Sequence, residues 1–534
     1  MELEIYDTTL RDGSQQEGIS LTVNDKLRVA LLLDDLGVAY IEGGWPGANQ
    51  KDTEFFKRAA AELNLRHAAL TAFGSTRRPG GKADTDEQLA SLLDAGTEHV
   101  CIVGKAWDYH VSETLRVDLD EGVRMVGESV EFLVGRGRSV FFDAEHFFDG
   151  YKSDPGFALA ALAAAHDAGA ERLVLCDTNG GNLPPEILRG VAAVQDRFPG
   201  ADLGVHLHDD VGTAVAASLA AVDVGVRQIQ GCINGYGERT GNANLSTLIP
   251  DLQLKMGRKA ISGDLDLLSP ISHHIAEIVN LTLNPHQPYV GTSAFTHKAG
   301  LHTSALARRP DAYEHENPGR VGNHTRMVVS ELAGRAAVVA KASEFGLDLD
   351  GDLAKSVVEQ VKLREHEGYH YEAADGSFEL LVREMTGWVN PYFGLESFRV
   401  LSDRRAGEEV ASEATIKLTV AGSRKVSIGE GVGPVHALDK AVRSALAGHY
   451  PQVADLRLTD YRVRVLDSQD GTSARVRVLI ETSNHTSSWG TIGVHENVIE
   501  ASWRALSDGI VVGLLRSGPS PVASVANAVS EKGQ

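Results

Sequence analysis

Eight short apolar segments recur through the first half of the chain, and stretches with helical spacing of apolar residues separate them. The predicted strands are Leu3–Thr9, Tyr40–Trp45, His67–Phe73, Val100–Lys105, Val140–His146, Arg172–Asp177, Leu203–His208 and Gln228–Asn234. Helical spacing is clearest over 25–36, 88–95, 157–168 and 185–194. Strand and helix alternating in units of about 30 residues are typical of a (β/α)8 TIM barrel, the fold we predict.

A doubly wound open sheet is the competing α/β fold. It predicts a glycine-rich dinucleotide turn after the first strand. The segment that follows the first predicted strand here runs Asp7-Thr8-Thr9-Leu10-Arg11-Asp12-Gly13 and is not such a turn. The barrel is therefore favoured.

Active sites of TIM barrels lie at the carboxyl ends of the strands, so the residues there are the candidates for chemistry. Seven of the eight predicted strands finish in polar or ionisable residues. These are Arg11 and Asp12, Glu42, Lys105, Glu145 and His146, Asp177, Thr178 and Asn179, His206 and His208, and Asn234.

His206 and His208 are two residues apart in a predicted strand, so both imidazoles leave the same face. Asp12 adds a carboxylate oxygen, and the loop 234–244 adds an amide oxygen from one of its asparagines. A set with at least two oxygens and no thiolate favours Mg²⁺ or Mn²⁺, and Zn²⁺ stays possible. The sequence predicts a catalytic metal with positions left for substrate or water.

From about residue 251 to 375 the pattern is mostly helical. This region contains a histidine-rich segment, 295–304, followed by Tyr313. We interpret it as a lid that carries an acid or base to the barrel mouth.

After residue 390 alternating strands return, with an internal repeat. Val432-Gly433-Pro434 and the following Ala441 are echoed sixty residues later by Ile492-Gly493-Val494 and Ala501. Two such halves indicate a pseudo-twofold α+β domain suited to binding a small effector or to dimerising. The predicted domains are a barrel at 1–255, helical linker subdomains with the lid histidine at 256–390, the regulatory domain at 391–516 and a disordered tail at 517–534.

The net charge of −22 argues against nucleic acid and anionic membranes as partners. It also means that a site for an anionic substrate must supply local positive charge. The three cysteines lie far apart in apolar segments and indicate a reducing compartment. With no export signal and no long apolar run, we expect a cytoplasmic protein.

Three motifs together resemble the 2-isopropylmalate, homocitrate and citramalate synthase family, a group of Claisen-condensing barrel metalloenzymes. They are the segment from Asp7 through Arg11 to Gln15, the segment His206-Leu207-His208-Asp209-Asp210, and the segment from Asn234 through Glu238 to Asn242. The C-terminal repeat resembles the leucine- or isoleucine-sensing domain of the same family. The resemblance extends to about residue 515.

Segments 41–49, 142–151 and 297–302 resemble the citramalate branch of that family. The resemblance implies condensation of acetyl-CoA with pyruvate on a route to isoleucine, a homodimer with lid residues donated by the partner subunit, and isoleucine as an effector. Close alternatives are 2-oxoisovalerate or 2-oxoglutarate as acceptor. A hydroxymethylglutaryl-CoA-lyase type of enzyme and a silent binding protein on this barrel are further alternatives.

The resemblance also implies roles for individual residues. It assigns Asp12, His206, His208 and Asn242 to the metal, so Asn242 rather than Asn234 supplies the amide. It assigns substrate binding to Arg11 and Thr178, and catalysis to Arg11, Glu145 and His302. From their positions at a strand end and in the lid segment, we add Glu42 to the substrate-binding residues and Tyr313 to the catalytic residues.

His302 is the expected base that enolises acetyl-CoA. Many relatives have Asp or Glu two residues after this histidine, where this chain has Ser304. Glu145, Tyr313 or another group is then expected to support His302.

Overall fold

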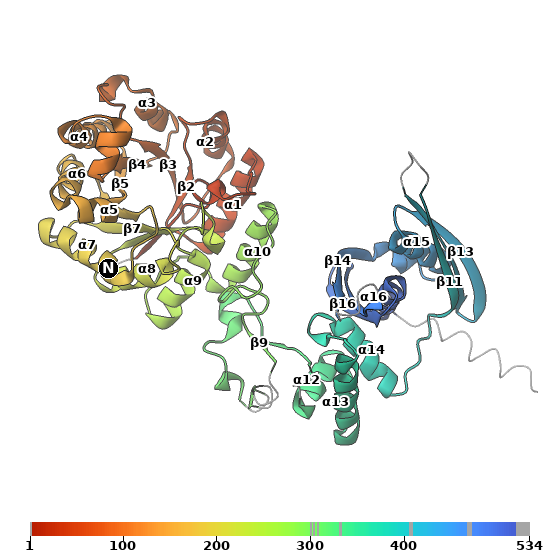
Figure 1. The fold of residues 1–534 in the computed structure, drawn as a ribbon. Coiled ribbons are helices and arrows are strands. Elements are labelled where there is room, and N and C mark those ends of the chain that lie inside the picture. Colours follow the sequence, from red (N-terminus) through yellow and green to blue (C-terminus); the bar gives the residue numbers. More distant parts are fainter. Residues whose placement is uncertain are drawn as a thin grey trace, which may run out of the picture. The chain divides into compact units, whose positions relative to one another are not determined.

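The computed structural model describes residues 3–298, 302, 305–306, 309–330, 334–404, 410–466 and 473–518. The chain forms two compact units (Figure 1). The first holds residues 1–295 and 315–325, and the second holds 296–314 and the chain from 326 onward. Each unit is described separately below.

Eight parallel strands of the first unit close into a barrel in chain order, because β1 pairs with both β2 and β8. The strands are β1 (Glu4–Asp7), β2 (Tyr40–Gly44), β3 (Ala69–Ser75), β4 (His99–Lys105), β5 (Ser139–Glu145), β6 (Arg172–Asp177), β7 (Leu203–Leu207) and β8 (Gln228–Gly231). Each overlaps its predicted segment, so the predicted TIM barrel is confirmed.

Helices surround the barrel (Figure 1). They are α1 (Val23–Leu36), α2 (Gln50–Glu62), α3 (Glu87–Asp94), α4 (Leu119–Gly135), α5 (Phe147–Ser153), α6 (Pro155–Asp167), α7 (Pro184–Arg197), α8 (Ala214–Asp223), α9 (Leu245–Pro250) and α10 (Leu268–Ile278). Two single π-helical turns, His110–Leu115 and Asp251–Lys255, complete the set of longer helical elements.

Local sequence signals account for the ends of α1. The Thr22 side chain accepts a hydrogen bond from the Asp25 backbone N–H, and the Asp25 carboxylate accepts one from the Thr22 N–H. This reciprocal capping starts the helix. Gly37, at φ 84°, ends it in the left-handed conformation that glycine adopts without steric cost.

The barrel interior is filled by large side chains rather than open. Tyr6, Phe73, Cys101 and Phe141 pack together there and are buried. The Tyr6 and Phe141 rings meet edge to face with centroids 5.9 Å apart. These residues form a solid core between the strands.

The second unit begins with a two-stranded parallel pair, β9 (Thr296–His297) and β10 (Arg326–Met327). Three helices follow: α12 (Arg335–Glu344), α13 (Gly351–His366) and α14 (Asp375–Met385). Two antiparallel three-stranded sheets come next, each followed by one helix. They are β11 (Phe393–Asp403), β12 (Ala411–Val420), β13 (Ser423–Gly431) and α15 (Pro434–Leu446), then β14 (Arg457–Val465), β15 (Val476–Ser483), β16 (Ser488–His495) and α16 (Val498–Arg516).

The repeat is confirmed, but its predicted register is wrong by four residues. A Cβ on Gly429 would lie 2.4 Å from the Ala437 oxygen, and a Cβ on Gly493 would lie 2.0 Å from the Ala501 oxygen. Gly429 therefore corresponds to Gly493, a separation of 64 residues rather than 60. A shift of four residues is nearly one helical turn and keeps the same apolar face, so the sequence pattern does not distinguish the two registers.

Several sequence-based predictions concern the edges of these units. The first unit continues past residue 255 through α10 to Phe295, so the segment predicted as linker divides between the two units. Helix α16 ends at Arg516, and 519–534, most of the predicted tail, lie outside the described residues. Among the described helices, none combines the length and apolar character needed to cross a membrane.

Candidate active site

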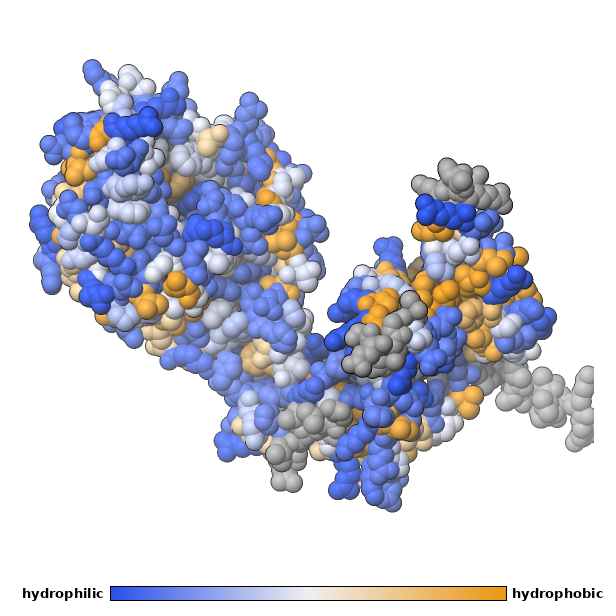
Figure 2. All heavy atoms as spheres, in the orientation of Figure 1, coloured by the Kyte–Doolittle hydropathy of each residue, from blue (hydrophilic) through white to orange (hydrophobic). Residues whose placement is uncertain are grey.

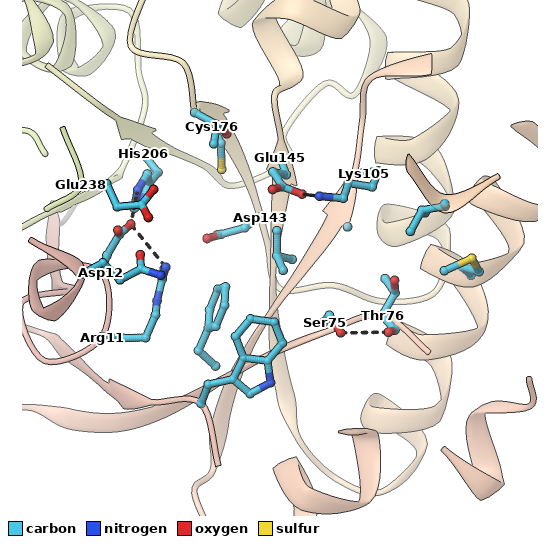
Figure 3. A pocket seen from close by; sticks show the side chains of 18 of the residues that line it. Arg11, Asp12, Ser75, Thr76, Lys105, Asp143, Glu145, Cys176, His206 and Glu238 are labelled. Carbon is cyan, nitrogen blue, oxygen red and sulfur yellow. Dashed lines mark hydrogen bonds and ion pairs between the residues drawn. The ribbon is translucent and has the colours of Figure 1, made fainter. Parts of the chain in front are cut away.

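A cavity of about 540 Å³ opens among the loops that follow the barrel strands. Figure 3 shows Arg11, Asp12 and His206 converging on one side of it and the Glu145–Lys105 pair on the other. Six of the predicted site residues line this cavity: Arg11, Asp12, Glu145, Thr178, His206 and His208. The barrel thus brings together side chains from four strand ends.

The guanidinium of Arg11 is held on three sides. Its Nε donates to Oε2 of Glu42 at 2.5 Å, its Nη1 lies 3.3 Å from Oδ2 of Asp12, and its Cζ lies 3.8 Å from the centre of the Phe73 ring. Burial lowers the pKa of Arg11, but Glu42 and Asp12 raise it more, and the guanidinium stays charged. This fixed cation is the local positive charge that an acidic protein needs to hold an anion.

Glu42 is completely buried and supports Arg11 from inside the barrel. Its second oxygen accepts a hydrogen bond from the Tyr6 hydroxyl at 2.8 Å. Burial raises the pKa of Glu42, and Arg11 opposes that rise by attracting the charged form. A contact between Glu42 and the substrate stays a prediction.

Asp12, His206 and His208 form a buried cluster whose ligand atoms lie within 4.8 Å of one another. Oδ2 of Asp12 lies 3.0 Å from Nε2 of His206 and 3.8 Å from Nε2 of His208. Burial raises the pKa of Asp12, but Arg11 and the two histidines lower it far more, so the carboxylate is ionised. The site attracts positive charge.

The two imidazoles differ in their electrostatics. Burial lowers the pKa of His208 to about 4, so this ring is neutral at pH 7 and offers lone pairs. Burial also lowers the pKa of His206, but the hydrogen bond to Asp12 and the charge of Asp12 raise it, and the net change is upward. Neutral imidazole is the form that binds metal.

The loop after β8 contains the two candidate asparagines, and their surroundings distinguish them. Oδ1 of Asn234 accepts from Ser246 at 3.1 Å and from Gln287 at 3.2 Å, and its Nδ2 donates to the Ser272 oxygen at 2.9 Å. Both the oxygen and the nitrogen of the Asn234 amide are therefore hydrogen-bonded within the protein.

Asn242 instead forms a backbone bridge with His208 and donates its Nδ2 to the Tyr236 oxygen at 3.0 Å. Its buried Oδ1 has no hydrogen-bond partner in the part of the chain that the structure describes. A buried carbonyl oxygen needs a partner, and a cation is one. Together with one carboxylate and two imidazoles, this oxygen fits a divalent metal ion.

Glu145 and Thr178 occupy other parts of the wall. Glu145 forms an ion pair with Lys105 at the end of the neighbouring strand β4. The Thr178 hydroxyl accepts from the His146 N–H at 2.9 Å, which ties the β5 and β6 loops together. His146 itself adopts φ 55°, a conformation uncommon outside glycine.

Arg239 was not singled out from the sequence, although it lies in the loop that was. Its guanidinium makes two hydrogen bonds to Asp210, at 2.7 and 2.9 Å, and donates to the Thr178 oxygen at 2.9 Å. It lines the cavity and fastens the loops after β6, β7 and β8 to one another. Its φ of 57° is a further sign of a constrained position.

His302 and Tyr313 belong to the second unit and lie against each other there. Their rings stack with centroids 4.1 Å apart and planes 24° apart. The His297 ring is also near, at 6.2 Å from His302. Of the groups expected to support His302, the structure places Tyr313 next to it, and Ser304 lies outside the described residues.

Two polar side chains inside the barrel were also missed. Asp143 lies in β5 and Gln230 in β8, both within apolar runs, and both are buried. The available signal in the sequence was a polar residue at an inward position of an apolar strand. Using that signal requires knowing which strand positions point into the barrel.

Comparison with known proteins assigns nearly the whole chain. Residues 2–274 match the HMGL-like family, 289–368 match a homocitrate synthase post-HMGL domain-like family, and 372–513 match the LeuA allosteric (dimerisation) domain.

Relatives match over nearly their full lengths. An (R)-citramalate synthase of Streptomyces coelicolor is 53% identical over 97% of both chains. One of Aquifex aeolicus is 50% identical over 96% of this chain and 98% of its own. A probable 2-isopropylmalate synthase of Methanopyrus kandleri is 31% identical over 95% of this chain and 97% of its own.

Proposed function

The chain belongs to the HMGL-like family and, within it, to the group formed by the (R)-citramalate synthases, and from this membership we propose that it condenses acetyl-CoA with pyruvate to give citramalate and CoA. Members of this group are acyl-condensing enzymes. The observation that carries the proposal is the buried cluster of Asp12, His206 and His208 beside the fixed guanidinium of Arg11. With a divalent metal held by the cluster, the metal and Arg11 would be two positive centres for the carboxylate and keto oxygen of a 2-oxo acid.

Asp12, His206, His208 and Asn242 would hold the divalent metal. The unpartnered oxygen of Asn242 and the oxygen-rich donor set favour Mg²⁺ or Mn²⁺. When bound, such an ion supplies Lewis acidity that draws electron density from the keto group of the acceptor.

The chain's own residues account for the rest of the reaction. His302 takes a proton from the methyl group of acetyl-CoA, and the methyl carbon then forms a bond to the keto carbon of pyruvate. Arg11 stabilises the negative charge that develops on the former keto oxygen, which is then protonated. Water cleaves the thioester to release CoA, and Thr178 and Glu145 line the cavity in which these steps occur.

The charges around the cavity favour a monocarboxylate acceptor. Lys105 is paired with Glu145, Arg77 with Glu121, and Arg239 with Asp210. A second carboxylate, as in 2-oxoglutarate, would have to break one of these pairs or reach Arg78 at the exposed rim of the cavity, which lies 3.9 Å from Glu87. This argues against homocitrate synthesis and leaves 2-oxoisovalerate as the acceptor to test against pyruvate.

We further propose a homodimer in which the partner subunit donates the lid residues, and isoleucine as an effector of the C-terminal domain. Support comes from the match to the LeuA allosteric (dimerisation) domain. The outer face of the β11–β13 sheet also exposes apolar residues, which gather over it in Figure 2. A place at the start of isoleucine synthesis follows from the proposed product.

The experiment measures CoA release from acetyl-CoA by thiol titration, with pyruvate, 2-oxobutanoate, 2-oxoisovalerate or 2-oxoglutarate as acceptor. We expect a strong preference for pyruvate, loss of release after EDTA treatment and recovery on adding Mg²⁺ or Mn²⁺. An isoleucine titration of the same reaction tests the effector.

Preference for 2-oxoisovalerate would keep the site but change the product. Release that survives EDTA would contradict the metal site. Absence of release with every acceptor would contradict the proposed condensation, and a flat isoleucine titration would contradict the effector.

A further inference from the structure

Gln230 is buried in the barrel interior and links two side chains from other strands. It lies in β8 directly opposite His206 of β7 in the strand register. Its Oε1 lies 2.9 Å from Nδ1 of His206, and its Nε2 donates to Oδ1 of Asp143 in β5 at 3.1 Å. The three side chains thus form a continuous hydrogen-bonded path.

The direction of this path follows from the chemistry at its inner end. A carboxylate accepts hydrogen bonds, so the Gln230 amide must turn its nitrogen toward Asp143. Its oxygen then faces His206. Because an amide oxygen only accepts, Nδ1 of His206 must carry a proton, and Nε2 is the nitrogen that can give up its proton and offer a lone pair to a metal.

The Cys101 thiol reinforces the inner end as a further hydrogen-bond donor to Asp143. Burial raises the pKa of Asp143, and the hydrogen bonds from Cys101 and Gln230 to its charged form oppose that rise. Both Asp143 and Gln230 are at most 3% exposed, so water does not compete for these contacts.

Nε2 faces the proposed metal site, where it hydrogen-bonds to Oδ2 of Asp12 at 3.0 Å. A divalent cation would displace the proton on Nε2, while Gln230 retains the proton on Nδ1. The path therefore selects the one imidazole tautomer that can bind a metal through Nε2.

We propose that Asp143 and Gln230 are positioning residues that fix the tautomer and ring orientation of His206 for metal binding. This Asp143–Gln230 relay rests on the proposed metal site. Neither residue has to contact the metal. Asp143 sets the direction of the Gln230 amide, and that amide sets which nitrogen of His206 keeps a proton.

The variant Asp143→Asn tests the relay with almost no change of shape. The new amide can present N–H to Gln230, which lets Gln230 turn over and present its own N–H to His206. The imidazole then carries its proton on Nε2, the wrong atom for the metal. We expect the dissociation constant for Mn²⁺, measured by titration calorimetry without substrates, to rise about 10- to 100-fold.

A double variant restores the direction of the path. In Asp143→Asn combined with Gln230→Glu, the new amide donates to the new carboxylate, whose other oxygen accepts from Nδ1 of His206. Mn²⁺ affinity is expected to return to within about threefold of the parent protein.

Cys101→Ala is the matched control, because it touches Asp143 but leaves the amide direction unchanged. Its Mn²⁺ affinity is expected to equal that of the parent protein. Gln230→Met, which keeps the volume and removes the hydrogen bonds, provides a second test if Asp143→Asn folds poorly, and circular dichroism checks folding throughout.

Unchanged Mn²⁺ affinity in Asp143→Asn and Gln230→Met would overturn the relay. The relay would also be overturned if the single variants bind Mn²⁺ weakly and the double variant does not recover. The loss of affinity would then come from disturbed packing and not from the direction of the hydrogen bonds. If the parent protein binds no Mn²⁺, the proposed metal site fails instead, and the two failures are thereby distinguished.

Discussion

At the scale of single residues, the site depends on side chains that are held before any ligand arrives. Arg11 is fixed by an ion pair, a second carboxylate and an aromatic ring, so little ordering is left for substrate binding. In the second unit, His302 is likewise held by stacking on Tyr313.

Replacing His302 by Asn tests the proposed base. Turnover should fall by about 10²- to 10⁴-fold, because a positioned general base contributes that much, while the KM for pyruvate changes little. Steady-state CoA release gives both values. A large rise in KM with turnover intact would show that His302 binds the acceptor rather than moving a proton.

Two substitutions of Tyr313 test how this residue supports His302. Tyr313→Phe keeps the stacked ring and should retain most of the turnover, whereas Tyr313→Ala removes the support of His302 and should lose much of it. Equal losses in the two variants would point to the hydroxyl instead.

At the scale of elements, the loop after β8 shows why glycines recur in it. Gly237 has φ 151°, and a Cβ on it would lie 2.2 Å from Nδ2 of Asn242. A Cβ on Gly241 would lie 1.9 Å from the Gly235 oxygen. Backbone packed this closely fixes the position of the Asn242 side chain.

Gly237→Ala should therefore displace the Asn242 amide and weaken Mn²⁺ binding by at least about tenfold, measured by titration calorimetry. Gly212→Ala is the matched control, since Gly212 also has positive φ, at 71°, but nothing lies within 4 Å of its Cβ position. Equal Mn²⁺ affinities in both variants would contradict this role of the loop.

Helices α14 and α16 meet at a partly buried acid, Asp508, from which we expect a dependence of stability on pH. The Ser377 hydroxyl donates to Asp508 at 2.6 Å and accepts from the Ile492 N–H at 3.0 Å. Burial raises the pKa of Asp508 from 3.8 to about 7. The folded protein thus holds a proton between these two pH values that the unfolded chain has lost.

Because the folded state binds more protons there, the free energy of unfolding should fall as pH rises from 4 to 7, by at most about 4 kcal/mol from this group. Asp508→Asn should match the parent at pH 4 and exceed it at pH 7. Urea unfolding followed by tryptophan fluorescence measures this, with Trp45 and Trp107 replaced by Phe so that only the second unit reports.

The exposed Asp455 is a suitable comparison, since its pairing is with a histidine at the surface. Asp455→Asn should leave the pH profile unchanged. A profile for Asp508→Asn that runs parallel to the parent profile would rule out Asp508 as its source.

At the scale of the whole molecule, the outer face of the β11–β13 sheet leaves apolar side chains exposed to solvent. Val426 is 56% exposed and Ile428 is 60% exposed, and because they are two residues apart in β13 their side chains lie on the same face of the sheet. Contiguous exposed apolar surface is typical of an interface.

Changing Val426 and Ile428 together to Lys should dissociate the proposed dimer, as measured by light scattering after size exclusion. Like charges brought together at a symmetric interface repel one another. Val224→Lys, at an exposed position on the barrel, should leave the oligomer intact. A dimer that survives the double change would place the interface elsewhere.

Much of this protein could be predicted from local patterns. Apolar runs of strand length alternating with helical periodicity determine the barrel, and polar residues at the strand ends identify Arg11, Asp12, His206 and His208, because a parallel barrel gathers those ends at one mouth. The C-terminal repeat could also be recognised from its local pattern, but helical periodicity does not distinguish registers that differ by one turn.

Only the tertiary structure decided the rest, because it depends on which atoms remain unpaired once the chain is folded. By residue type and spacing alone, Asn234 and Asn242 are indistinguishable. In the folded chain the amide of Asn234 is hydrogen-bonded, whereas the side-chain oxygen of Asn242 has no partner among the described residues. Asp143 and Gln230 lie 87 residues apart in apolar strands, and only barrel closure turns them toward His206. Residue types are local properties, whereas hydrogen-bond direction is a property of the closed barrel.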